Sequence, residues 1–154
     1  MATIKPKMPT DLMEKITRLG DRTDEICEKA LKAGAEIVEK AVASNLDAVI
    51  GKNTKYESRS TGELKSALGV TPVSMDKKGN YDIKIGFDEP RKNQTAAKCK
   101  RSYGEVTNAM LANILEYGRQ GQPPKPFLKP AKTASMKPAK AKMIEVLETE
   151  CENI

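Results

Sequence analysis

The sequence predicts an α+β fold in which a long N-terminal helix and two C-terminal helices pack on a small antiparallel β-sheet, a hairpin at about residues 67–87. Three observations predict it: a long apolar stripe at helical spacing, one segment that alternates strictly between apolar and polar residues, and two further helical patterns after that segment. A length of 154 residues suits one domain with a single core. We expect an extended basic arm over residues 1–9, because Pro6 and Pro9 disfavour helix there, and one α+β domain over residues 10–154.

The first helix is predicted over about residues 11–48, with Thr10 as its N-cap. Its main apolar row recurs at steps of three, four or seven residues and comprises Leu12, Ile16, Leu19, Ile26, Ala30, Ala33 and Ile37. A second row flanks the first and comprises Cys27, Leu31, Val38 and Val42. The resulting stripe is wide enough to pack on a sheet rather than on one partner helix. Gly20 and Gly34 weaken the helix modestly, and it is expected to end near Gly51.

A hairpin is predicted next, after a short helical turn. Ser60 and Glu63 have the spacing of a capping box, which would start a turn through Leu64. In the strand that follows, the apolar phase changes at Thr71-Pro72, where we expect a bulge or an edge position because proline cannot donate to the ladder. The segment DKKGN then turns the chain. The clearest strand has one apolar and one polar face, and its apolar residues are Tyr81, Ile83, Ile85 and Phe87.

Two helices separated by a proline-rich loop are predicted in the C-terminal part. Ser102 and Glu105 form a second capping box, and the helix after them is expected to stop at Gly118. Four prolines between residues 119 and 130 exclude regular helix and central strand, yet this loop carries Phe127 and Leu128. We interpret these two side chains as anchors, either to the chain's own core or to a neighbouring subunit.

The last helix is predicted from about residue 131 or 135 to residue 152. Pro138 either kinks this helix or lies in its first turn. Its inward residues are expected to include Ala139, Met143, Leu147 and Cys151.

Charge is distributed unevenly along the C-terminal part. The net charge is +6, and because acids are interspersed through most of the chain, lysine is expected mainly to keep the protein soluble. The exception is residues 119–142, which hold no acid and seven bases: Arg119, Lys125, Lys129, Lys132, Lys137, Lys140 and Lys142. The charged residues that follow residue 142 are all glutamates. Acidic side chains therefore lie at the C-terminal end of the last helix, where they oppose its dipole. The candidates for electrostatic contact with an acidic partner surface are Arg119, Lys125, Lys129 and Lys132.

Composition argues against the commoner catalytic chemistries. Histidine is absent, which removes the commonest general base and metal ligand, and no motif supplies another base to a serine or cysteine nucleophile. The three cysteines are scattered without a CxxC pair, which favours a reducing compartment over a disulfide framework or a zinc site. We therefore expect no enzyme activity, no metal and no cofactor. Because no long apolar run occurs, we also expect no membrane span and no signal peptide.

The hydrophobic fraction is 38%, with no tryptophan, so the core must be thin. Such a core suits a subunit that completes its burial in an assembly, and it equally suits a modest ordinary domain.

Two groups of residues resemble the signature of a known family. One begins at the end of a helix, crosses a polar loop and enters the last helix, with Glu116, Tyr117, Gly118, Pro126, Phe127, Leu128, Pro130 and Ala131. The other precedes the strands, with Thr61, Gly62, Leu64 and Ser66. Their order resembles the tail-component or neck proteins of tailed bacteriophages, which join heads to tails and complete the tail, and the resemblance covers most of the chain from residue 10 onward. The chain departs from the family pattern in a longer, better-capped helix before Glu116 and in a highly charged linker over residues 88–100.

The resemblance implies a structural virion protein without catalytic activity. It implies a ring subunit of the neck, between the capsid connector and the tail tube, with six copies per ring and twelve as the alternative. The implied partners are other copies of the chain, the portal-side connector or stopper protein, and the tail terminator or tube protein. DNA would pass through the ring without specific binding, no membrane would be involved, and assembly would take place in the bacterial host cytoplasm.

Two other functions stay open on the sequence alone. The first is a tail terminator that caps the tail tube, which the sequence separates poorly from a neck protein. The second is a basic nucleic-acid-binding module, which is disfavoured because aromatic and basic residues are not interleaved and no helix-turn-helix pattern occurs. A steep salt dependence of DNA binding would distinguish the second.

Overall fold

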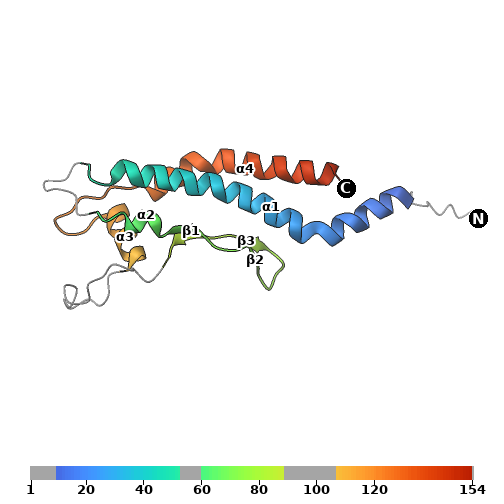
Figure 1. Ribbon diagram of the computed structural model, residues 1–154, viewed down its shortest axis with the longest axis horizontal. Coiled ribbons are helices and arrows are strands. Elements are labelled where there is room, and N and C mark those ends of the chain that lie inside the picture. The colour runs from blue at the N-terminus through green and yellow to red at the C-terminus, as the bar shows by residue number, and fades with distance from the viewer. Residues whose placement is uncertain (1–9, 53–59, 89–106, 154) are drawn as a thin grey trace, which may run out of the picture.

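The computed structural model describes residues 10–52, 60–88 and 107–153. A 40-residue helix, α1 (Thr10–Val49), runs through the molecule, and a 25-residue helix, α4 (Leu128–Glu152), lies antiparallel along it. On the other side of α1 lie the β-hairpin and two shorter helices, α2 (Glu63–Ser66) and α3 (Asn108–Tyr117) (Figure 1). The predicted α+β arrangement of a long N-terminal helix, C-terminal helices and a small antiparallel sheet is confirmed.

Helix α1 packs mainly on α4 and also contacts β1, β3 and β4 of the hairpin. The sequence predicts that the apolar stripe of α1 packs on a sheet rather than on one helix. Its main partner is instead the helix α4, and the sheet is the lesser one. Helix α1 thus has partners on two sides, and small residues at Ala30, Gly34 and Ala35 lie where α4 comes close. Ala30 and Ala35 are buried, and a Cβ added at Gly34 would lie 2.3 Å from Cε of Met143. Gly34 is thus a contact point between helices and not only a weak point of α1.

The hairpin forms where it was predicted, and its ladder is interrupted at the proline. Strand β1 (Leu68–Val70) pairs with β4 (Ile85–Phe87), and β2 (Ser74–Met75) pairs with β3 (Tyr81–Asp82), both antiparallel. Between the two ladders, the Thr71 amide donates to the Lys84 carbonyl at 2.8 Å, and the Lys84 amide donates to Thr71 Oγ1 at 3.0 Å. The threonine side chain thus accepts a hydrogen bond where the regular ladder breaks next to Pro72.

Two side chains fix the far end of the hairpin. In the turn, the Asp76 carboxylate accepts hydrogen bonds from the amides of Lys78 and Asn80 at 2.7 and 2.9 Å. The Asn80 amide and side chain, with the Lys78 amide, hold the pKa of Asp76 below its usual value. The Tyr81 hydroxyl donates to Asp24 on α1, and this hydrogen bond is the main reason why the pKa of Tyr81 rises to about 12. The tip of the hairpin is therefore joined to α1.

Several helix boundaries differ from the predictions. The N-cap of α2 is Gly62, at φ 75°, without a side-chain capping bond, so the proposed Ser60–Glu63 capping box is not the start of this helix. The N-cap of α3 is Thr107, whose side chain accepts from the Met110 amide at 3.1 Å. The predicted Ser102–Glu105 box lies outside the described residues, as does the N-terminal arm.

Helix α4 begins earlier than predicted and includes both nearby prolines. It starts at Leu128, which places Pro130 in the first turn, where no amide donor is needed. Pro138 lies inside the helix, where it leaves the Ala134 carbonyl without its helical donor on an exposed side accessible to water. Ala139 is buried and Met143 and Leu147 are half-buried as predicted, but Cys151 is exposed.

The core lies at one end of the molecule, where all four helices meet. It consists of Val42, Leu46, Leu64, Ala112, Phe127 and Ala131. At the other end of the α1–α4 pair, charges also join the two helices: Glu150 of α4 lies 3.2 Å from Lys29 and 3.7 Å from Arg22, and Lys29 pairs within α1 with Glu25 at 2.9 Å. Because Lys29 is exposed and Arg22 and Glu150 are partly exposed, these pairs add little stability, and burial of apolar side chains, Ile26 at this end and the core at the other, carries most of it.

Within the described part of the chain, no helix has both the length and the apolar character that crossing a membrane would require.

Gly34→Ala should be less stable than Gly20→Ala, although both changes add the same helix propensity. A Cβ at Gly20 meets no neighbouring atom within 4 Å, so this control variant should gain about 0.5–1 kcal/mol. A Cβ at Gly34 meets Met143, and such overpacking costs about 1–3 kcal/mol. Urea unfolding measures the difference, which should shrink when Met143→Ala is added. Equal stabilities of the two glycine variants would contradict the close contact at Gly34.

Candidate functional site

The candidate site is the junction at which α3 ends, the proline-rich loop turns back, and α4 begins. Gly118 ends α3 as predicted: its amide donates to the Ile114 carbonyl at 2.9 Å, and its φ is 76°. A Cβ at this position would lie 2.8 Å from the Gln122 carbonyl oxygen and from the Pro124 nitrogen. Both the positive φ and the close backbone approach therefore require glycine here.

The loop after Gly118 is held by backbone hydrogen bonds despite its prolines. The Arg119 and Gln122 amides and carbonyls bond reciprocally, at 3.0 and 2.8 Å, around Gly121 at φ 78°. The Lys125 amide then donates to the Leu115 carbonyl at 2.7 Å and returns the loop to α3. Because proline fixes φ and leaves few conformations to lose, this loop enters α4 in one geometry.

Glu116 on α3 caps the N-terminus of α4. One of its carboxylate oxygens accepts from the amides of Phe127 and Leu128, each at 2.8 Å, and the other accepts from the Lys129 amide at 3.0 Å. Pro130 has no amide donor, and the Ala131 amide donates to the Phe127 carbonyl at 3.2 Å. Every donor of the first turn is thereby satisfied, by a side chain only 6% exposed.

The Glu116 carboxyl stays ionised in this position. Burial by itself raises its pKa, but the amides of Phe127, Leu128 and Lys129, together with the Lys129 ammonium, outweigh burial and hold the pKa below its usual value. A carboxylate at a helix N-terminus also faces the positive end of the helix dipole. Charge and hydrogen bonding therefore favour the same arrangement.

Phe127 fills the chain's own core. Its side chain is 0% exposed and meets the Phe87 ring edge-to-face, with centroids 6.1 Å apart at 64°. Leu64 lies in the same cluster, and the Asn45 side-chain amide donates to the Phe127 carbonyl at 3.3 Å. The sequence left two interpretations of Phe127 open, an anchor to its own core or to a neighbouring subunit. The observed side chain is an anchor to its own core. The two family-like segments meet here, through Leu64 and Phe127.

The other motif residues lie closer to the surface. Tyr117 is 78% exposed, and Leu128 is half-buried at the edge of the core. The remaining exposed ones are Thr61, Gly62, Pro126 and Pro130. The motif thus combines buried structural residues with one exposed aromatic ring, which stands beside the buried Glu116.

The four basic candidates have different surroundings. Arg119 and Lys132 are exposed. The Lys125 ammonium donates to the Lys52 carbonyl, and Lys129 contributes to stabilising the Glu116 carboxylate. No ion pair within 4 Å joins any of the four to another residue in the described ranges. Within the described ranges, Arg119 and Lys132 are therefore the two candidates whose charge stabilises no other part of the structure.

Sequence reasoning missed the role of Glu116. It placed Glu116 in a motif but assigned it no partner, because the amides it binds lie 11 to 13 residues further along the chain. One signal was available: a helix that starts at Phe127-Leu128 has no Ser, Thr, Asp or Asn before it, so its cap had to come from elsewhere.

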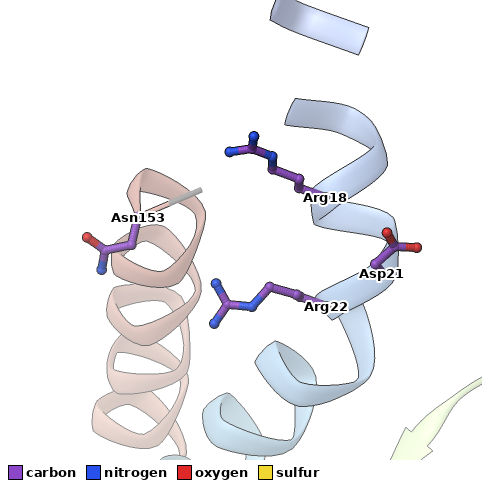
Figure 2. A pocket seen from close by; sticks show the side chains of 4 residues that line it. All are labelled: Arg18, Asp21, Arg22 and Asn153. Carbon is purple, nitrogen blue, oxygen red and sulfur yellow. The ribbon is translucent and has the colours of Figure 1, made fainter. Parts of the chain in front are cut away.

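A second region with several polar groups lies where α4 ends beside α1. Arg18, Asp21, Arg22 and Asn153 line a hollow there, and Figure 2 shows both guanidinium groups on the side of α1 that faces α4. Arg22 belongs to the salt-bridge cluster with Glu150. Among the residues that the structure describes, no three His, Cys, Asp or Glu side chains are placed to hold a metal ion.

At the junction and along the helix pair, the residues singled out above either stabilise the fold or lie exposed on the surface. A family model described as "Bacteriophage HK97-gp10, putative tail-component" matches residues 10–118, which is 109 of the 154 residues, and the chain belongs to that family. It is thus a member of a phage tail-component family, which is a family of structural proteins rather than of enzymes. The match ends at Gly118, so the Pro-Phe-Leu segment and α4 lie beyond it. No curated protein and no solved structure matches the chain.

Glu116→Ala should destabilise the protein by on the order of 3 kcal/mol, because it leaves the amides of Phe127, Leu128 and Lys129 without their acceptor. Glu116→Gln keeps one acceptor oxygen and should lie between this variant and the parent. Chemical denaturation measures both. Glu145→Gln is the control: its exposed pair with Lys142 should contribute less than about 0.5 kcal/mol. A Glu116→Ala protein as stable as the control would contradict the capping role.

The contribution of Glu116 should also depend on pH. Because its pKa is lowered in the folded state, the stabilisation is complete above the ordinary carboxyl pKa of about 4.3 and is lost as the pH falls through the lower, folded pKa. The stability difference between the parent and Glu116→Gln should therefore be constant near neutral pH and shrink in acid. A difference that grows below pH ~4 would contradict this assignment.

Proposed function

We propose that the protein is a ring subunit of the neck of a tailed phage or phage-like particle, where it joins the capsid connector to the tail tube. The observation that carries the proposal is membership of the phage tail-component family over residues 10–118. The ring would contain six copies, with twelve as the alternative. The protein would act in the virion after assembly in the host cytoplasm.

The distribution of the core supports assembly into a larger structure. In the described ranges, the large side chains that are fully buried are Phe127, Leu46 and Asn108, whereas along the rest of the α1–α4 pair the buried apolar residues are mostly small, with Ile26 beside Ala30, Ala35 and Ala139. A closed ring needs two different surfaces on each subunit, because its contacts run head to tail. The α1–α4 pair and the two-stranded hairpin lie on different sides of the molecule and supply two such surfaces (Figure 1).

The junction supports a role in presenting contact residues. Glu116 fixes the end of α3 to the start of α4, so Tyr117 and Arg119 are held on a rigid base. An exposed aromatic ring that is already ordered loses little entropy on binding. Tyr117 therefore replaces Phe127 as the aromatic residue that contacts a neighbour.

The basic residues of the junction would face an acidic partner ring above or below. A neck ring must let DNA slide through, and tight binding of phosphates in the lumen would oppose that movement. Arg119 and Lys132 are the appropriate pair for this contact because both are exposed and neither supports Glu116 or the loop.

Tyr117→Ala should leave stability within about 0.5 kcal/mol of the parent but block the joining of heads to tails, because the ring is exposed. Phe127→Ala is the contrasting variant and should lose about 3–5 kcal/mol by emptying the core. Thermal melting of the purified proteins and electron microscopy of particles made with each variant give the two readouts. Normal particles from a stable Tyr117→Ala protein would argue against contact through Tyr117.

Reversing Arg119 and Lys132 to Glu should leave filled heads and separate tails. Substitutions of opposite sign in the partner ring should restore part of the infectivity. If particles instead join normally but release DNA slowly, these residues line the channel and the proposed direction is wrong. Attachment of the protein only at the tube end would identify a tail terminator.

A further inference from the structure

Helix α4 carries two charge segments of opposite sign. Residues 128–142 contain five lysines and no acid, and residues 143–152 contain four glutamates and no base. Both segments oppose the helix dipole, which favours acid at the N-terminus and base at the C-terminus. The arrangement therefore raises the energy of an isolated α4 and calls for compensating charges from outside the helix.

Only part of this charge is compensated within the described part of the chain. Glu116 faces the first turn, Glu150 pairs with Lys29 and Arg22 on α1, and Lys142 pairs with Glu145 at 2.8 Å. The α4 residues that form no ion pair with another described residue include Lys140 and Glu148. These two lie one helical turn before and one turn after Ile144.

Lys140, Ile144 and Glu148 lie along the outer face of α4. Ala131, Ser135 and Ala139 are the buried residues of the helix and mark its opposite, inner face. Ile144 is 53% exposed, and Met136, two turns earlier, is 44% exposed. Along this face the order is base, apolar residue, acid, at equal spacing. A helix that runs in the opposite direction presents the order acid, apolar residue, base, so that each base lies opposite an acid.

We propose that two copies of the chain bind each other through this face of α4, antiparallel, about a two-fold axis at Ile144. Ile144 then contacts the partner's Ile144, and Lys140 lies opposite the partner's Glu148 on each side of the axis. In this register residues 136–142 of each helix, which carry three of its five lysines, face residues 146–152 of the other, so the acidic segment that opposes the dipole in one copy is compensated by lysines of the second.

The charge pattern selects a second copy over other occupants. Phosphates of a nucleic acid would be repelled by Glu148 and Glu152, and a uniformly acidic protein surface would be repelled in the same way. A single helix pair with few apolar residues buries much less than the roughly 1,200 Å² of stable complexes, so the dimer is weak and depends on concentration. The contact is isologous and differs from a head-to-tail ring contact, so it belongs to the free protein before assembly and its failure leaves the proposed neck function standing.

Sedimentation velocity of the full chain over micromolar to millimolar concentration tests the proposal. Lys140→Glu and Glu148→Lys should each weaken dimerisation about tenfold, which corresponds to roughly 1.4 kcal/mol, because each places like charges opposite each other twice. The double variant should restore it. Within one chain the two residues are about 12 Å apart, beyond the Debye length of about 8 Å at physiological salt, so the restoration cannot come from within the chain. Lys77→Glu in the hairpin turn is the control and should dimerise like the parent.

A cross-link provides a readout that does not depend on affinity. In a chain with Cys27, Cys99 and Cys151 changed to Ser, Ile144→Cys should form a disulfide-linked dimer on mild oxidation. Cys151 restored alone should not, because the axis at Ile144 separates it from its copy by roughly 21 Å along the helices. A monomeric parent at every concentration, a double variant as weak as the single ones, or equal cross-linking through Cys151 would each overturn the proposal.

Discussion

The arrangement of the C-terminal half depends on one buried carboxylate. Phe127 is the N-cap residue of α4, but its phenyl ring, which is buried in the core, has no oxygen or nitrogen that could accept a hydrogen bond from the helix. Glu116 supplies the acceptor from α3, so the start of α4, the path of the proline-rich loop and the burial of Phe127 form together. Because α4 begins at this point, its alignment along α1 follows from the same interaction.

The two ends of the α1–α4 pair are stabilised by different physical effects. At the junction end, Leu46 and Phe127 are fully buried and hydrophobic burial dominates. At the other end, Ile26 is buried, and Lys29, Arg22 and Glu150 form partly exposed ion pairs that salt screens. Opening of the helix pair should therefore begin at the charged end, which leaves the junction and its exposed Tyr117 intact.

Much of the fold could be predicted from local patterns, whereas partners distant in sequence could not. The alternation through Tyr81 and Phe87 and the stop at Gly118 are local signals, and both were found in the structure. Periodicity showed that the stripe of α1 is wide but not that α4 covers most of it, because that depends on close approach at Gly34. The core role of Phe127 and the capping role of Glu116 likewise depend on contacts across the loop, which spacing alone does not show.

The burial of Phe127 changes where contact surfaces can lie. With that side chain in the core, the junction presents Tyr117 and basic side chains on a base that Glu116 keeps rigid. The outer face of α4 presents a different pattern, with Lys140 and Glu148 on either side of Ile144. A surface with charge of one sign favours a different protein of opposite sign, whereas a surface that carries both signs in mirrored order favours a copy of itself. One chain can therefore carry both kinds of surface, because they lie at different positions along α4, and the contact between copies forms before assembly.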